Sequence, residues 1–201
     1  MMRAFFVICV TAILLLPSAA LAGGGFELTP FVGYQFGGDI ETSYQGIYND
    51  ISVNSGENFG MAASFDLNPE TQIELLYSTQ DTSADARRFD GSFGLTIDYW
   101  QISGIYNFNP FDDVRPYVVF GLGATSLRPD GFSNETKFSG NFGGGVKVFL
   151  NDNIGLRLDG RLYATYISST TAYCDPYWCY GYNNSLYQFN VSAGLIVRFG
   201  N

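Results

Sequence analysis

Seven charged residues of this sequence are candidates for chemistry, because each lies in the polar phase of a segment in which polar and apolar residues alternate. They are Glu27, Glu74, Lys147, Arg157, Asp159, Arg161 and Arg198. Two carboxylates placed close together can act as a general acid and a general base. The cations among the seven argue against that use, since buried charges are costly unless they are paired. We therefore expect an interior network of salt bridges.

The sequence contains no histidine. Imidazole is a common general base because its proton exchanges near neutral pH. Its absence excludes a Ser-His-Asp arrangement and every metal site that uses histidine ligands. A glycine-rich stretch, Gly140–Lys147, superficially suggests a phosphate loop, but its lysine is not followed by serine or threonine. We expect a protein that is not an enzyme and that has no cofactor and no metal.

The segments that position these residues alternate between two faces with the period of a β-strand. They lie near residues 26–36, 58–65, 72–78, 93–108, 117–125, 137–148, 156–166 and 187–199. One face of each segment is apolar and nearly free of charge, while the other carries the charged residues named above. Lipid outside and a paired polar interior explain this pattern, whereas a soluble barrel such as a lipocalin has the opposite polarity.

Short and long connections alternate between these segments. The short ones are 66–71, 109–115 and 151–153, and the long ones are 37–57, 80–92, 128–136 and 168–185. Outer-membrane barrels have short periplasmic turns and longer extracellular loops. The sequence therefore predicts an all-β fold, an eight-stranded antiparallel up-and-down transmembrane β-barrel with its N and C termini in the periplasm.

The fourth segment departs from simple alternation. Its apolar residues occupy odd positions up to Tyr99 and even positions from Trp100 onward. One extra residue in a strand, a β-bulge, produces such a change of phase. We therefore predict a bulge near Tyr99.

The first 22 residues do not share the strand pattern. Arg3 precedes an apolar run, Ala4–Leu16, and Ala20 and Ala22 offer small residues at the positions that signal peptidase reads. The run is too short to span about 30 Å of hydrocarbon at about 1.5 Å per residue. We expect residues 1–22 to be a cleaved signal peptide and residues 23–201 to form one outer-membrane barrel domain.

The exported chain would keep two cysteines, Cys174 and Cys179, in a tyrosine-rich segment. An even pair in an exported protein predicts a disulfide. That bond would hold Tyr177, Trp178 and Tyr180 in one small loop. Tyrosine and tryptophan are favoured contact residues, so the loop is a candidate recognition or adhesion surface. Packing against the other loops and the lipopolysaccharide boundary is the alternative.

Several stretches resemble a known family. Phe26–Tyr34 (FELTPFVGY), Arg115–Val119 (RPYVV) with the following Gly121 and Gly123, and the C-terminal strand are similar to small proteobacterial OmpA/OmpW-type outer-membrane β-barrel proteins. The similar motifs are architectural. The resemblance therefore implies a fold and a location rather than an activity.

The last segment also resembles the signal that the barrel-assembly machinery reads in that family. The family pattern is a polar residue, a glycine two positions on, and apolar or aromatic residues alternating near the end. The matching residues are Ser192, Gly194, Val197 and Phe199. This chain departs from the pattern because Gly200 and Asn201 follow the aromatic residue.

The net charge of −9 argues against nucleic acid as a partner. The partners we expect are outer-membrane lipid, lipopolysaccharide, the barrel-assembly machinery and, at the surface, an extracellular or host ligand. We expect a monomer in the bacterial outer membrane with a structural or surface-exposed role, in envelope integrity or in adhesion and recognition. A narrow porin-like channel, or a conduit for small solutes or hydrophobic ligands, is the alternative.

Overall fold

The computed structural model describes residues 25–44, 47–86, 91–131, 133–168, 173–174, 179–180 and 183–200. The strands are β1 (Phe26–Phe36), β2 (Asp39–Tyr44), β3 (Ile47–Val53), β4 (Gly56–Asp66), β5 (Thr71–Ala86), β6 (Gly91–Asn107), β7 (Val114–Pro129), β8 (Glu135–Phe149), β9 (Ile154–Ser168), β10 (Tyr173–Cys174), β11 (Cys179–Tyr180) and β12 (Asn183–Phe199). Within these residues, no helix is both long enough and apolar enough to cross a membrane.

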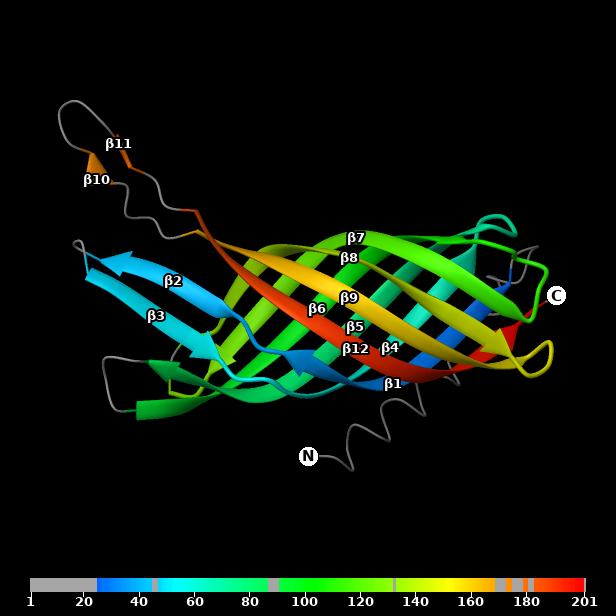
Figure 1. The fold of residues 1–201 in the computed structure, drawn as a ribbon, viewed down its shortest axis with the longest axis horizontal. Coiled ribbons are helices and arrows are strands. Elements are labelled where there is room, and N and C mark those ends of the chain that lie inside the picture. The colour runs from blue at the N-terminus through cyan, green and yellow to red at the C-terminus, as the bar shows by residue number, and fades with distance from the viewer. Residues whose placement is uncertain are drawn as a thin grey trace.

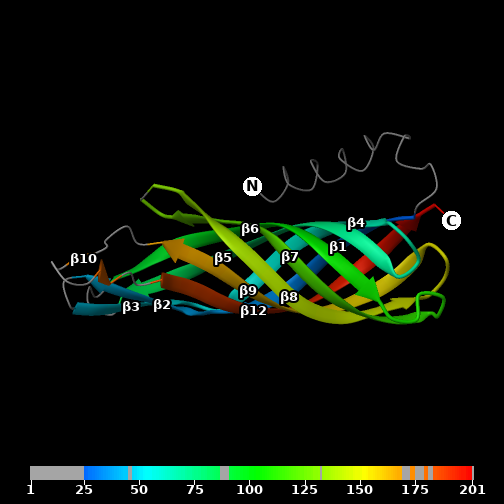
Figure 2. The ribbon, with the colours of Figure 1, turned by 90° about the horizontal axis from the view of Figure 1, so that it is seen from above.

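Eight of the strands close into a barrel (Figure 1; Figure 2). The order around the barrel is β1, β4, β5, β6, β7, β8, β9 and β12, and β12 pairs with β1 to close the ring. Every neighbouring pair is antiparallel. Closure leaves no free strand edge, which matters in lipid because an unpaired backbone group is costly there. The predicted eight-stranded antiparallel barrel is confirmed.

The two faces of the wall have opposite polarity. Large apolar side chains point outward, and Val32, Trp100 and Phe142 are each more than half exposed. Charged side chains point into the lumen, where Glu74 and Arg161 are at most 1% exposed. An apolar outer face around a polar interior is the arrangement of a barrel that lies in lipid.

Outward aromatic side chains pack together at two places on the wall. Midway along β5 and β6, the rings of Tyr77 and Trp100 lie 4.4 Å apart between centroids. Toward the short turns, the rings of Tyr106 and Phe108 lie 5.2 Å apart. Such aromatic residues are typical of the two interfaces between the hydrocarbon and the head groups.

Two of the segments predicted as long loops, 37–57 and 80–92, are largely strands, so that part of the prediction is wrong. β2 pairs with β3, and β3 pairs in turn with the outer part of β5. β5 and β6 stay paired as far as Ala86 and Gly91. These hairpins project from one end of the barrel, while the short turns and the end of β12 lie at the other (Figure 1). β2 and β3 are short, at six and seven residues, and the mainly apolar phase of each contains a polar residue, Thr42 or Asn49, so alternation gave only a weak signal.

The structure also overturns the bulge predicted near Tyr99. β6 keeps a continuous register with both neighbours through this residue. Leu95, Ile97 and Tyr99 point into the lumen in the same phase as Gln101, and all four are more than nine-tenths buried. The change at this point is therefore in the chemistry of the lumen and not in the phase of the strand.

The seam at which β1 meets β12 has one interruption. The register between these strands omits Thr29 and Pro30, although β1 stays paired with β4 through both residues. Proline has no N–H group to donate to a facing carbonyl. Gly194 on β12 lets the backbones approach closely here, since a Cβ atom at this position would lie 2.8 Å from the carbonyl oxygen of Pro30. Two separate runs of hydrogen bonds therefore close the barrel.

Candidate functional site

Four charged residues meet in the middle of the lumen, and we call them the central charge cluster: Glu74, Arg157, Asp159 and Arg161. Glu74 accepts from both arginines, with Oε2 2.5 Å from Arg157 Nη1 and Oε1 2.8 Å from Arg161 Nη2. Asp159 also faces both, with Oδ1 2.6 Å from Arg161 Nε and Oδ2 3.1 Å from Arg157 Nη2. The structure thus brings these four sequence-predicted residues into one network.

The central charge cluster joins opposite walls of the barrel. Glu74 lies on β5, and the other three residues lie on β9, which is four strands away in either direction around the ring. Arg157, Asp159 and Arg161 share one face of β9 because they occupy every second position. An eight-stranded barrel is just wide enough for side chains to fill its interior. Ion pairs can therefore span this lumen directly.

Little space is left around the central charge cluster. A void of about 10 Å³ borders Arg157, Asp159 and Arg161. The Nη1 atom of Arg161 has no hydrogen-bond partner among the described residues. A void of this size holds about one water molecule at most. The lumen is therefore closely filled around these ion pairs.

A second set of polar side chains lies toward the short turns, and we call it the mouth cluster: Glu27, Asp66, Gln72, Lys147 and Arg198. Lys147 Nζ lies 2.6 Å from both Glu27 Oε2 and Gln72 Oε1. Arg198 Nη2 lies 2.6 Å from Asp66 Oδ2, and its Nη1 lies 3.7 Å from Glu27 Oε1. The three members that the sequence analysis named, Glu27, Lys147 and Arg198, are joined here by Asp66 and Gln72, which it missed.

Tyr117 on β7 connects the two clusters. Its hydroxyl donates to Asp159 and accepts from Arg157 Nε at 2.8 Å. The guanidinium carbon of Arg157 lies 4.8 Å from the centroid of the tyrosine ring, and Lys147 Nζ lies 5.8 Å from it. Both distances suit cation–π attraction. Tyr117 occupies the polar phase of its strand, which is the signal that could have identified it.

Uncharged polar side chains line the next level, toward the long hairpins. Gln101 Nε2 donates to Ser139 Oγ at 2.7 Å, and Gln101 Oε1 accepts from Asn141 Nδ2 at 3.0 Å. The hydroxyl oxygens of Thr125 and Thr165 lie 2.9 Å apart. These hydrogen bonds join strands that are two places apart in the ring. Because the groups are neutral, this level needs no counter-charge.

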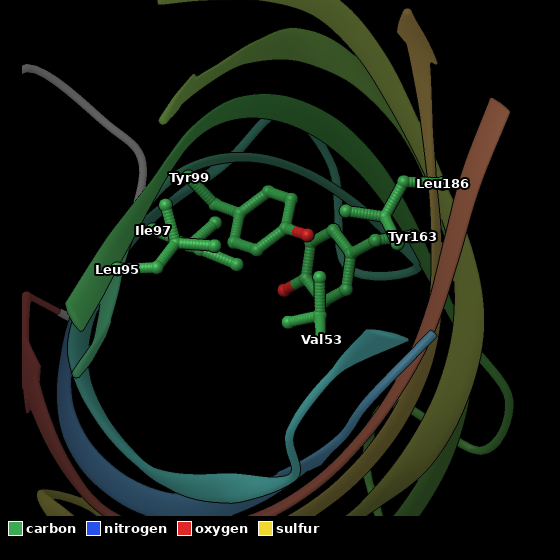
Figure 3. Close-up of a cluster of buried hydrophobic side chains, with 6 residues drawn as sticks. All are labelled: Val53, Leu95, Ile97, Tyr99, Tyr163 and Leu186. Carbon is green, nitrogen blue, oxygen red and sulfur yellow. The ribbon is translucent and has the colours of Figure 1, made fainter. Parts of the chain in front are cut away.

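The long-hairpin end of the lumen is filled by an apolar cap, which consists of Val53, Leu95, Ile97, Tyr99, Tyr163 and Leu186 (Figure 3). The rings of Tyr99 and Tyr163 lie side by side, with centroids 4.3 Å apart. The Tyr99 hydroxyl donates to Gln188 Oε1 at 2.5 Å. The expectation that every charge-poor face lies against lipid is wrong at this end. Burial inside the wall stabilises apolar side chains as effectively as lipid does.

The predicted disulfide residues are opposite each other in backbone register. Cys174 and Cys179 are register partners in the two-stranded pair of β10 and β11. Tyr180 follows Cys179 in β11. Tyr177 and Trp178 lie outside the described residues. The disulfide and the recognition loop stay predictions.

The predicted assembly-signal residues, Ser192, Gly194, Val197 and Phe199, all lie in β12. The first two share the inward phase of the strand, and the last two share the outward phase. Phe199 lies opposite Phe26 across the closing seam, with ring centroids 6.0 Å apart. Whether the assembly machinery reads these residues stays a prediction.

The carboxylates of the lumen are all engaged by cations or by hydrogen-bond donors, so the arrangement suits cross-linking of opposite walls. Within the described ranges, no group of three or more cysteine, aspartate or glutamate side chains is placed to hold a metal ion. The chemistry that these residues support is therefore charge pairing.

The barrel architecture also emerges from comparison with solved structures. Neisserial surface protein A (NspA) is 18% identical, with a TM-score of 0.60 over 88% of this chain and 99% of that chain. The outer membrane protein AlkL, solved in DMPC lipid bilayers, is 15% identical, with a TM-score of 0.58 over 88% of this chain and 91% of that chain. OprG from Pseudomonas aeruginosa is 12% identical, with a TM-score of 0.57 over 90% and 97%. These likenesses show a shared fold.

No curated protein sequence matches the chain. Residues 8–199, however, match the family described as outer membrane protein beta-barrel domain. This match spans nearly the whole sequence and agrees with the closed wall and its apolar outer face. The chain therefore belongs to the outer membrane protein beta-barrel domain family and is an outer-membrane β-barrel protein.

Proposed function

We propose that this protein is a closed, non-enzymatic barrel that supports the envelope and presents a contact surface outside the cell. The observation that carries this proposal is the central charge cluster, whose ion pairs span the lumen from β5 to β9. The mouth cluster also fills the lumen toward the short turns, and the apolar cap fills it toward the long hairpins. A filled lumen suits a structural or surface role better than transport.

The proposed orientation puts the short turns and both ends of the barrel wall in the periplasm. The pronounced difference in hairpin length between the two ends supports it, because outer-membrane barrels keep their short turns on the periplasmic side. Cleavage of residues 1–22 during export and recognition of β12 by the assembly machinery belong to the same proposal. The mature protein would then lie as a monomer among outer-membrane lipids and lipopolysaccharide.

In this orientation the long hairpins form the outward surface. β2 and β3 extend past the barrel, and the β10–β11 pair carries Cys174 and Cys179 opposite each other. Paired strands hold the backbone of these hairpins in a fixed register, which favours recognition of an extracellular or host ligand.

Planar-bilayer recording tests the closed lumen. Wild type, Glu74→Ala and Arg157→Ala are all expected to show negligible conductance beside an open porin recorded in the same bilayers. Steady conductance steps from wild type would contradict the proposal and favour the conduit for small solutes. Steps from the variants alone would also contradict it, because the central charge cluster would then be a gate.

Adhesion assays test the surface role. Bacteria that carry wild-type protein should bind host cells or matrix more than bacteria that carry Cys174→Ser. Asp152→Asn is the matched control, since Asp152 is an exposed residue in a short turn at the other end. Equal binding by all three strains across several ligands would remove the adhesion role and leave the structural one.

A further inference from the structure

The short-turn end of the lumen opens into a recess of about 380 Å³. The mouth cluster forms its floor, and Asn107 and Arg115 add polar groups to its walls. Leu67, Pro110 and Phe111 form an apolar side, and Phe111 is 85% exposed. The recess therefore combines charged, polar and apolar surfaces in a space large enough for a small molecule.

The Nη donors of Arg115 are free to bind a ligand in this recess. Its Nε donates to the carbonyl oxygen of Asp112 at 2.7 Å, and its guanidinium carbon lies 4.2 Å from the centroid of the Phe149 ring. These two contacts fix the plane of the guanidinium. Within the described part of the chain, Arg115 forms no ion pair within 4.0 Å, and the carboxylates of Glu27, Asp66 and Asp113 act on its charge from farther away. A fixed guanidinium with free Nη donors matches the geometry of a carboxylate.

Asn107 supplies an unused acceptor. The residue is only 4% exposed, and its amide nitrogen donates to the carbonyl oxygen of Glu70 and to Gln72 Oε1, each at 3.3 Å. Its Oδ1 has no hydrogen-bond partner among the described residues. A buried acceptor that lacks a donor is unfavourable. A ligand with an N–H group would relieve that cost.

The charge balance of the recess favours an anion, although the whole chain is acidic. Its lining contains three cations and two carboxylates, against a net charge of −9 for the chain. The carboxylates of Glu27 and Asp66 are already held by Lys147 and Arg198. Arg115 is therefore the cation that an incoming anion would meet.

We propose that this recess binds a small carboxylate that also carries an N–H donor and an apolar group, as the C-terminal residue of a peptide does. The carboxylate pairs with the guanidinium of Arg115, and the N–H donates to Asn107 Oδ1. The apolar group packs against Phe111 and its neighbours. This site is independent of the proposed surface role, which assigns no task to this end of the barrel.

Calorimetric titration of the detergent-solubilised protein with N-acetyl-leucine tests the proposal, because that probe has all three features. Wild type should bind it saturably with one site. N-acetyl-leucinamide, which lacks the charge, should bind about tenfold more weakly or worse, and Arg115→Gln should lose about as much affinity for the acid. Arg128→Gln is the matched control, since Arg128 is a cation near the long-hairpin end, and it should bind like wild type.

A second variant separates the apolar part of the site. Phe111→Ser should weaken binding of N-acetyl-leucine and leave binding of acetate unchanged. The proposal is overturned if wild type shows no saturable binding, if acid and amide bind equally, or if a folded Arg115→Gln protein binds like wild type. Should Arg115→Gln fail to fold, the comparison of acid and amide on wild type decides the question alone.

Discussion

The central charge cluster and the apolar cap fill one lumen with opposite chemistry. In the first, Glu74 and Asp159 hold two arginines through ion pairs of 2.5–3.1 Å. In the second, six apolar or aromatic side chains pack against one another, with one hydroxyl bonded to Gln188. The same wall of alternating strands encloses both regions. Backbone pattern alone therefore does not decide what the interior of a barrel contains.

The two regions differ in how they tolerate change. A buried ion pair that loses one partner leaves a charge without compensation, which costs more than most cavities. A buried apolar side chain that is shortened leaves a cavity whose cost depends on how far the neighbours relax. Substitutions in the central charge cluster should therefore lower the free energy of unfolding more than substitutions in the apolar cap.

Glu74→Ala should be the most destabilising change. It leaves Arg157 and Arg161 to share the single carboxylate of Asp159 in a buried site, and we expect a loss of about 3–5 kcal/mol. Urea unfolding of the refolded protein in lipid vesicles measures the free energy of unfolding. Ser64→Ala is the control, because it removes only a long hydrogen bond of 3.5 Å to Glu74. If Glu74→Ala costs no more than this control, the charged region does not carry the stability that we assign to it.

Ile97→Ala should be the next largest change. Ile97 is fully buried in the apolar cap, so its loss creates a cavity worth about 2–4 kcal/mol. Ile102→Ala on the same strand is the control, since Ile102 is 62% exposed on the outer face and lipid can fill the space that it leaves. Equal unfolding free energies for the two variants would show that the cap is not packed as a core.

Two tyrosines allow the same atom to be removed from each region. Tyr117→Phe deletes a hydroxyl bonded to Asp159 and Arg157, and should cost about 1.5–3 kcal/mol because its partners are charged. Tyr99→Phe deletes a hydroxyl bonded to Gln188, and should cost about 0.5–1.5 kcal/mol. Unfolding measurements in the same vesicles compare the two. A larger loss for Tyr99→Phe would reverse the contrast between the regions.

Arg128→Gln should have the smallest effect. Arg128 pairs with Asp98 at 2.5 Å, but its own side chain is 45% exposed, and the buried Asp98 keeps a second donor, the Tyr77 hydroxyl at 3.1 Å. Exposed ion pairs contribute at most about 1 kcal/mol and weaken as salt screens them. The effect of Arg128→Gln on unfolding should therefore shrink as sodium chloride is added, whereas that of Glu74→Ala should change little. An equal salt response would mean that the central charge cluster is open to solvent.

The wall could be predicted because lipid imposes a rule on every strand that crosses it. β12 alternates from Tyr187 to Phe199 with one exception, the inward apolar residue Ile196, and alternation of that length is typical of a strand with lipid on one face. The charges of the lumen followed from the same rule, since Arg157, Asp159 and Arg161 occupy successive polar positions on one strand.

The contacts across the lumen could not be predicted in the same way. Tyr117, Asp66 and Gln72 take part because β7, β4 and β5 bring them to the right height, and alternation along one strand does not encode that height. The error at Tyr99 has a related cause. An apolar residue in the inward phase was unexpected, because the sequence does not mark where the lumen changes from polar to apolar.

The interrupted seam at Pro30 has a mechanical consequence. β1 and β12 are antiparallel and their outer ends, Phe26 and Phe199, lie side by side. A force that pulls these two ends apart loads the hydrogen bonds between the strands one after another, in an unzipping geometry, instead of all together. The tear would start with the short run at Phe26–Leu28 and reach the missing pairs at Thr29 and Pro30 almost at once. The seam between β1 and β12 is therefore the line along which the closed wall would separate first when it is pulled from this end.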